Sequence, residues 1–318
     1  MRDGSRRLLA RMIQAAIVAV SVSAVLVYAN PAFLRLPYLY GVPVRSPYCT
    51  LWKASQDAEI AIQQGKTTDR LHAASRVTMQ EGGLELWDTP AGPFWVPSGN
   101  PHILSILLAQ QRRNIYGANG WGVRKGDIVI DCGAHVGVYT KKALSEGARL
   151  VIAVEPSPDA VKSLRRNLAA EIAAGRVIIY PKGIWDSEQT LTFYINGNSD
   201  AGNSFINKNA KSTRVIVPVN SIDGLVQELK LPRVDFIKAD VKGATERMLQ
   251  GAATTLVRFR PRLALSTEEP PENPASLAEL VNRLAAKSYE MTCGPCLIIG
   301  GEVSTDVVFF RGRERATT

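Results

Sequence analysis

The stretch GDIVIDCGAHVGVYT, residues 126–140, decides the fold expected for this chain. Residues 128–132 form a short apolar run, which is typical of a strand buried on both faces of a sheet. Gly133 can take a left-handed turn and let a ligand approach the backbone, and Gly137 can bring a helix close to the strand. A strand, a glycine loop and a helix in this order indicate a nucleotide-type cofactor, although the loop alone does not identify it.

Apolar runs and helix-like segments alternate over the rest of the chain. Strands are predicted at 150–155, 177–180, 191–195, 214–219, 234–240 and 262–267, and helices at 158–174, 221–230, 243–257 and 275–287. This alternation predicts an α/β fold with a doubly wound, mostly parallel sheet and right-handed crossovers. Residues 289–293 and 306–310 are expected to form an antiparallel terminal hairpin. Since such sheets bind ligands beyond the carboxyl ends of their strands, we expect the chemistry in the loops after Asp131, Glu155, Gly183 and Asp240.

Two acids at strand ends narrow the choice of cofactor. Glu155 ends the second strand, 24 residues after Asp131, where a carboxylate can accept hydrogen bonds from ribose hydroxyls. An anion at Asp131 would repel a pyrophosphate but suits the ammonium of a methionine moiety, directly or through water. The pair therefore favours S-adenosylmethionine over NAD, and the missing third glycine of G-x-G-x-x-G agrees. In the plainer alternative, both acids only cap loops or helices.

With these pieces in this order, the sequence resembles the FkbM family of methyltransferases from about residue 126 to residue 267. The resembling segments are GDIVIDCGAHVG, VIAVEPSPDAVKSLRRNL, IIYPKGIWDSEQTLTFYI, VDFIKADVKGATERMLQGA and RPRLAL. The resemblance implies a class I, Rossmann-like methyltransferase that uses S-adenosylmethionine. It also implies O-methylation of a small-molecule or glycan-like acceptor, such as a glycan, lipid-linked or secondary-metabolite hydroxyl. The residues that it places at the cofactor are Asp131, Gly133, Ala134, His135, Gly137, Glu155, Pro156, Asn167, Gly183, Ile184, Asp186 and Asp240.

The sequence departs from the family pattern in the D-V-E-G-x-E segment. Lys242 and Thr245 stand where the family has glutamates, and Glu246 comes one position later, about 100° away around a helix. Ser266 takes the place of the usual acid after the fifth strand, with Glu268 slightly beyond it. If the family glutamates shape the acceptor pocket, this chain takes a different acceptor or has reduced activity.

A hydroxyl acceptor needs a base, although placing it in line with the methyl group supplies most of the acceleration. The catalytic candidates at the correct edge of the sheet are His135, Asp240, Lys242 and Glu268. Asp240 is the favoured base because it ends a strand facing the site, with helix capping as its alternative role. His135 could instead only hydrogen-bond within the loop, and Lys242 could bind an anionic acceptor or be a solvated charge.

Three functions stay open at this point. They are a methyltransferase, an NAD-dependent oxidoreductase on the same fold, and a degenerate cofactor-binding or scaffold protein, which Lys242 and Thr245 favour. A chain that is 46% hydrophobic and 21% charged is globular in composition. The net charge of +9 comes without a dense basic block carrying interleaved aromatics, so nucleic acid is not an expected partner.

The four cysteines are too few for a disulfide scaffold. Cys293-Gly-Pro-Cys296 has the spacing of a redox motif or of half a zinc site. The apolar, glycine-broken LIIGG follows it instead of a helix, and no second ligand pair accompanies it. A tight turn between terminal strands is therefore expected, and no metal.

Residues 12–29, MIQAAIVAVSVSAVLVYA, contain no charge and are just long enough to cross a bilayer. They predict a single-pass N-terminal transmembrane helix and a membrane location, with a cleavable signal peptide or a buried core helix as alternatives. The positive-inside rule conflicts with a cofactor made in the cytoplasm, so the side of the domain stays open. The expected division is a membrane anchor at 1–30, a connector with helices and a hairpin at 31–120, and the methyltransferase domain at 121–318.

Overall fold

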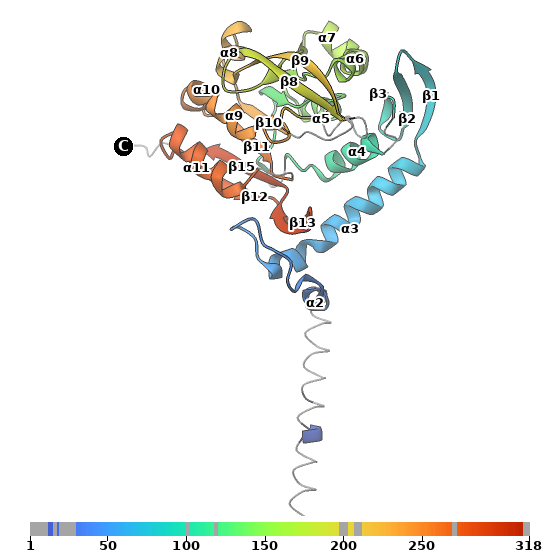
Figure 1. The fold of residues 1–318 in the computed structure, drawn as a ribbon, viewed down its shortest axis with the longest axis vertical. Helices are drawn as coiled ribbons and strands as arrows, with labels where there is room; N and C mark the ends of the chain where they lie inside the picture. The colour runs from blue at the N-terminus through green and yellow to red at the C-terminus, as the bar shows by residue number, and fades with distance from the viewer. Residues whose placement is uncertain are drawn as a thin grey trace, which may run out of the picture.

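A seven-stranded sheet in the order β12-β15-β11-β10-β4-β5-β6 forms the centre of the protein (Figure 1). The structure is a computed structural model and describes residues 12–14, 18, 30–99, 102–117, 120–196, 203–206, 212–268 and 272–313. The strands are β4 (Ile128–Cys132), β5 (Leu150–Val154), β6 (Val177–Tyr180), β10 (Phe236–Ala239), β11 (Arg262–Ser266), β12 (Tyr289–Cys293) and β15 (Val307–Gly312). Only β15 runs against its neighbours, pairing with β11 and β12. The doubly wound, mostly parallel sheet and the antiparallel pairing of the terminal strands are thus confirmed.

Strand β4 shows why the quoted stretch decides the fold. All five of its residues are buried. Ile128 and Ile130 pack into the cluster on one face of the sheet, and Val129 packs into the cluster on the other. The side chains of a strand point alternately to the two faces of the sheet. When both faces are buried, most positions are apolar, and the sequence shows the continuous apolar run from which this strand was predicted.

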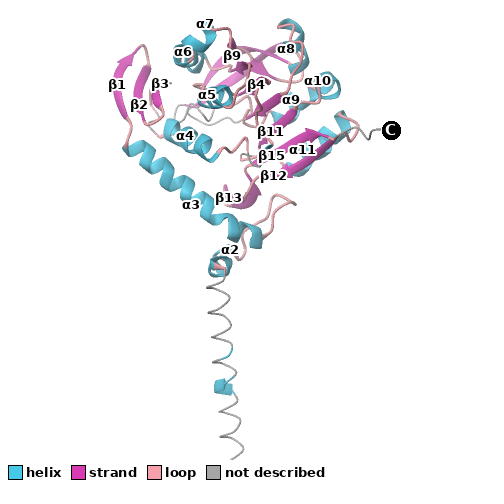
Figure 2. Cartoon of the chain, turned by 180° about the vertical axis from the view of Figure 1, so that it is seen from behind, coloured by secondary structure: helices cyan, strands magenta, loops and turns pink. Residues whose placement is uncertain are grey.

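Helices cover both faces of the sheet (Figure 2). One face carries α5 (Val138–Ser145), α6 (Pro158–Asn167) and α7 (Ala169–Ala173), and the other carries α8 (Ile222–Glu228), α9 (Thr245–Gln250), α10 (Ala253–Arg258) and α11 (Pro274–Leu284). Two segments predicted as single helices are each divided in two. The second division falls at Gly251, where a Cβ would lie 2.4 Å from the carbonyl oxygen of Trp185. A side chain at this position would clash with that oxygen, so glycine is required here.

A second sheet lies beside the first and consists of β7 (Gly183–Ile184), β8 (Gln189–Asn196) and β9 (Ser212–Asn220). The predictions of strands at 191–195 and 214–219 were correct, but these strands do not join the central sheet. In β9, Val217 and Val219 are buried while Ile216 is 69% exposed. This alternation is that of a sheet with one solvated face, unlike the continuous burial of β4.

The segment before residue 121 is a folded extension. It contains η1 (Pro31–Leu34), α2 (Leu36–Leu39), α3 (Leu51–Ala73), β1 (Arg76–Glu81), β2 (Leu84–Thr89), β3 (Gly92–Pro97) and α4 (Ile103–Arg113). The hairpin predicted within residues 31–120 is present as β1 and β2, which are joined by Gly82 and Gly83, and a third strand, β3, pairs with it. Helix α3 runs along the outside of the domain, with the β1–β3 sheet at its carboxyl end, and packs against α4 and β13 (Cys296–Ile299) (Figure 1).

A disulfide joins this extension to the terminal strands. Cys49 bonds to Cys296, 247 positions later, and Cys293 is a free, partly buried thiol. Cys296 begins β13, which pairs with β14 (Glu302–Thr305), so Gly294 and Pro295 connect β12 to a short hairpin. The C-x-x-C segment therefore joins two terminal strands that lie in different sheets, without the tight turn that was expected, and one of its cysteines takes a distant partner.

Removing this cross-link is expected to lower the free energy of unfolding. The double variant Cys49→Ser/Cys296→Ser should lose about 2–5 kcal/mol, because the bond restricts a long loop in the unfolded chain. Urea unfolding measures the loss, with Cys293→Ser as the control that keeps the disulfide. Equal stability of the double variant and the control would show that the cross-link contributes nothing.

The prediction of an N-terminal transmembrane helix, and with it a single-pass membrane location, is corrected. Within the described residues no helix is both long enough and apolar enough to cross a bilayer. The longest described helix, α3, has 23 residues but carries charges along its length, including Lys53, Asp57 and Arg70. Most of residues 12–29 lies outside the described part of the chain.

Candidate functional site

A cavity of about 510 Å³ opens beyond the carboxyl ends of β4, β5 and β10. This is the edge where doubly wound sheets bind their ligands. The glycine loop supplies Gly133, Ala134 and His135 to the lining, and the second sheet supplies Gly183, Ile184 and Phe193. Helix α4 closes another side with residues that include Ile106 and Gln110. The extension before residue 121 is therefore part of the site.

Gly133 takes the left-handed turn expected of it, Gly137 also has a left-handed backbone, and the close neighbours of both glycines are other parts of the protein. Gly133 has a φ of +78°, and a Cβ there would lie 2.2 Å from the carbonyl oxygen of Asp240. Gly137 has a φ of +89°, and a Cβ there would lie 2.9 Å from Leu164 of α6. Both positions combine a left-handed backbone with close neighbours, so only glycine fits without strain.

Glu155 lines the cavity at the end of β5, with only 6% of its surface exposed. Its Oε2 accepts a hydrogen bond from the backbone N–H of His135, and its Oε1 accepts one from that of Ser157, both at 2.8 Å. Burial raises the pKa of this carboxyl, although the neighbouring His135 and the two N–H donors act in the opposite direction. Each carboxylate oxygen has a second lone pair, which suits a pair of ribose hydroxyls.

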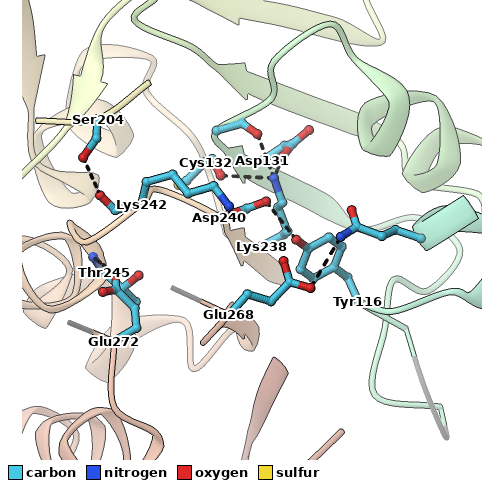
Figure 3. Close-up of polar contacts among 12 residues, drawn as sticks. Tyr116, Asp131, Cys132, Ser204, Lys238, Asp240, Lys242, Thr245, Glu268 and Glu272 are labelled. Atoms are coloured by element: carbon cyan, nitrogen blue, oxygen red, sulfur yellow. Dashed lines mark hydrogen bonds and ion pairs between the residues drawn. The ribbon is translucent and has the colours of Figure 1, made fainter. Parts of the chain in front are cut away.

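Asp131 lies beneath the glycine loop and is not part of the cavity lining. It is fully buried, accepts a hydrogen bond of 2.7 Å from Thr140, and forms an ion pair of 3.0 Å with Lys238 (Figure 3). Lys238 does line the cavity, and its Nζ also donates to the carbonyl oxygen of Gly133 at 2.8 Å. The structure thus puts a buried ammonium, and not the Asp131 carboxylate, at this wall of the cavity.

The Lys238–Asp131 pair is expected to support the fold as well as the site. Lys238→Met should lower the free energy of unfolding by about 3–5 kcal/mol, because it leaves a buried carboxylate without its counter-charge. Lys238→Met/Asp131→Asn should recover part of this loss. Urea unfolding tests both variants, with Lys142→Met as the control, since Lys142 pairs with Glu146 near the surface. A cost for Lys238→Met no larger than that of the control would contradict this role.

Asp240, the favoured base, is held by two neighbours (Figure 3). Its Oδ1 lies 3.1 Å from Nζ of Lys242, and its Oδ2 accepts a hydrogen bond of 3.2 Å from the hydroxyl of Tyr116. Burial opposes the ionisation of Asp240, but the charges of Lys242 and Lys238 outweigh it and lower its pKa to about 2. Asp240 is therefore ionised at neutral pH and a weak base.

Glu268 lines the same cavity, but its pKa is raised where that of Asp240 is lowered. It follows β11, and burial, with the charges of Asp240 and Asp306, raises its pKa to about 7. Its Oε1 lies 3.5 Å from the side-chain nitrogen of Gln110 on α4. Arg45 of the extension fixes the start of this loop by donating a hydrogen bond of 2.7 Å to the carbonyl oxygen of Thr267.

Some of the predicted residues lie outside the cavity lining. The side chain of Asn167 donates to the carbonyl oxygens of Trp95 and Val136, so it ties the β1–β3 sheet to the glycine loop. Asp186 forms an ion pair of 2.8 Å with Arg247. The remaining predicted residues that the structure brings to the cavity are Ala134, His135, Pro156, Gly183, Ile184, Asp240, Lys242 and Glu268.

Several residues that line the cavity were not among the candidates, and Lys238 and Tyr116 are two that make polar contacts there. Lys238 carried a signal, because a lysine inside the buried run VDFIKAD needs a counter-charge in the core. Tyr116 carried none: it follows α4, far along the chain from the motifs, and reaches Asp240 only through the fold.

Comparison with known families identifies the family to which the chain belongs. A family model described as the methyltransferase FkbM domain matches residues 131–291, half of the chain. The chain belongs to the FkbM methyltransferase family. S-adenosylmethionine is therefore its cofactor, and the glycine loop with Glu155 fits an adenosyl group. A comparison with curated protein sequences finds no match.

Three solved structures illustrate the similarity of this chain to known folds. An FkbM methyltransferase from Methylobacillus flagellatus is 15% identical, with 90% of this chain and 60% of that one covered and a TM-score of 0.48. A putative methyltransferase from Streptococcus mutans, in complex with SAH, is 13% identical, with 64% and 97% covered and a TM-score of 0.40. TYW2 from P. horikoshii, in complex with MeSAdo, is 13% identical, with 74% of each chain covered and a TM-score of 0.40. The chain thus spans about 60% of the length of the Methylobacillus protein.

Proposed function

We propose that this FkbM methyltransferase moves the methyl group of S-adenosylmethionine to a hydroxyl of a glycan, lipid-linked or secondary-metabolite acceptor. The observation that carries the proposal is the pairing of two carboxyl groups on one cavity. Glu155 is positioned by backbone N–H groups beside the glycine loop, and Glu268 has a pKa of about 7. The first suits binding of ribose hydroxyls, and the second suits removal of a proton.

In this proposal the adenosyl group lies along the glycine loop, with its ribose hydroxyls on Glu155. Pro156, Ile184 and Phe193 offer apolar surface in the same part of the cavity lining. Lys238 faces the end of the cavity where Gly133 and Tyr116 also lie, and its ammonium suits the carboxylate of a methionine moiety. When bound, the cofactor supplies an electrophilic methyl group on a sulfonium.

Glu268 replaces Asp240 as the favoured base. A general base works best when its pKa lies near the operating pH, and of the two carboxylates Glu268 and Asp240, Glu268 meets this condition. Its carboxylate takes the proton of the acceptor hydroxyl as the new O–C bond forms. Asp240 stays ionised and orients Lys242 and the hydroxyl of Tyr116 toward the acceptor.

At Lys242 and Thr245, where the sequence departs from the family pattern, carboxylates from another loop lie nearby. Glu268 lies close enough to Lys242 for that charge to lower its pKa. Glu272 is buried and accepts a hydrogen bond of 3.1 Å from the backbone N–H of Thr245 (Figure 3). Acids therefore stand beside both altered positions, which favours an active enzyme with its own acceptor over a degenerate scaffold.

Transfer of labelled methyl from S-adenosylmethionine tests the proposal. The full chain is incubated with a panel of hydroxyl acceptors that contains glycans, lipid-linked sugars and secondary metabolites, next to amine and thiol acceptors of similar shape. We expect label in at least one hydroxyl acceptor and its loss in Glu268→Gln. Label only in amine or thiol acceptors would refute O-methylation, and cofactor binding without any transfer would support the degenerate scaffold.

A further inference from the structure

A second hollow, of about 690 Å³, lies at the edge of the central sheet opposite the cofactor cavity. It is lined by five arginines, Arg124, Arg260, Arg262, Arg311 and Arg313, together with Glu290. Arg262 is the first residue of β11 and Arg311 stands near the end of the antiparallel β15, so the hollow lies at the amino ends of the parallel strands. We call it the arginine cleft.

The charges of the arginine cleft do not cancel. Arg262 forms an ion pair with Asp127, and Arg311 forms one with Glu290. Within the described part of the chain, the other three arginines have no carboxylate in ion-pair range. Arg260 and Arg313 instead donate to the backbone carbonyl oxygens of Ser288 and Tyr289, at 3.2 and 3.0 Å, which are neutral partners.

These contacts also hold several guanidinium groups in place. Arg262 donates a hydrogen bond of 3.2 Å to the carbonyl oxygen of Gly122. The guanidinium of Arg311 lies 4.3 Å from the centre of the Trp121 ring. Partial burial lowers the pKa of Arg262, and the nearby charge of Arg124 contributes to this, while Asp127 and Asp235 act in the opposite direction. A preorganised group of cations loses less side-chain entropy when it binds an anion.

We propose that the arginine cleft binds the phosphate group of a phosphate ester. The planar guanidinium group donates two parallel hydrogen bonds, a geometry that matches phosphate oxygens, and several arginines together can neutralise its charge. The phosphate can belong to a soluble ester or to a lipid headgroup, since both offer the same oxygens. This site lies apart from the cofactor cavity, so the inference holds whatever the acceptor of the methyl group is.

Calorimetric titration of the full chain at two salt concentrations tests the proposal. The probes are pyrophosphate, dihexanoyl phosphatidylglycerol as a soluble lipid with an anionic headgroup, and dihexanoyl phosphatidylcholine as its zwitterionic control. The test variant is Arg124→Ala/Arg313→Ala, which removes two exposed arginines of the cleft. The matched control is Arg165→Ala/Arg214→Ala, which removes two exposed arginines from α6 and β9.

We expect pyrophosphate or the phosphatidylglycerol to bind, and the affinity to fall by about tenfold or more in the test variant, because charge-assisted hydrogen bonds are lost. The control should bind as the wild type does. Binding of pyrophosphate alone would indicate a soluble phosphate ester, and binding of the phosphatidylglycerol alone would indicate a headgroup. No binding of either probe, or an equal loss in both variants, would overturn the proposal. Thermal unfolding checks that both variants are folded.

Discussion

Glu268→Gln is expected to lower kcat for methyl transfer by about 10²–10⁴-fold, the range that a positioned general base contributes. The amide is close in size to the carboxyl but cannot accept the proton of the acceptor hydroxyl. The dissociation constant for S-adenosylhomocysteine should stay unchanged, because Glu155 and the glycine loop are intact. Single-turnover kinetics and calorimetry separate the two effects, with Glu188→Gln on the exposed surface as the control.

The pH dependence gives a second, independent reading of Glu268. Its pKa is raised to about 7, so the carboxyl is protonated and inactive below that pH and becomes a base above it. The wild-type kcat should therefore rise with pH through about 7, and Glu268→Gln should lack this limb. A variant that keeps both the rate and the limb would exclude Glu268 as the base. Asp240, with a pKa of about 2, would produce no change in this range.

Glu155→Gln is expected to weaken binding of S-adenosylhomocysteine by about 10²-fold or more, since two hydrogen bonds to a charged acceptor each contribute about 1.5–3 kcal/mol. Calorimetry with the full chain measures the change. Glu155 also accepts hydrogen bonds from the loop, so a merely structural loss has to be distinguished from lost ligand contacts.

An analogue that lacks both ribose hydroxyls makes this distinction. The wild type should bind the analogue much more weakly than S-adenosylhomocysteine, while Glu155→Gln should bind the two ligands alike. If the variant still discriminates as strongly as the wild type, Glu155 acts through the loop and does not hold the ribose.

The central sheet could be predicted because its strands are buried on both faces, so each is a continuous apolar run. The strands β8 and β9 were found but assigned to the wrong sheet. The alternation at the end of β9, with Ile216 and Pro218 exposed and Val217 and Val219 buried, was the available sign of a solvated sheet. The need for glycine at position 251 depends on contact with Trp185, a residue far away in the sequence.

The part of the candidate site that depends on local sequence patterns could also be predicted. Gly133 and Glu155 belong to local patterns at strand ends, and the structure places both at the cavity. The choice between Asp240 and Glu268 depends instead on charges brought from distant elements, such as Lys238 and Asp306. The Cys49–Cys296 bond is a similar case, since spacing alone does not reveal a partner 247 positions away.

The central claim is that the cavity beside the glycine loop is an S-adenosylmethionine site that also holds the base. Calorimetric titration of the full chain with S-adenosylmethionine, S-adenosylhomocysteine and NAD tests this claim most directly. Glu155→Gln and Glu268→Gln are titrated in parallel. We expect one equivalent of either sulfur ligand to bind the wild type and Glu268→Gln, weak binding to Glu155→Gln, and no heat from NAD. Binding of NAD instead, or unchanged binding of S-adenosylmethionine to Glu155→Gln, would contradict the account.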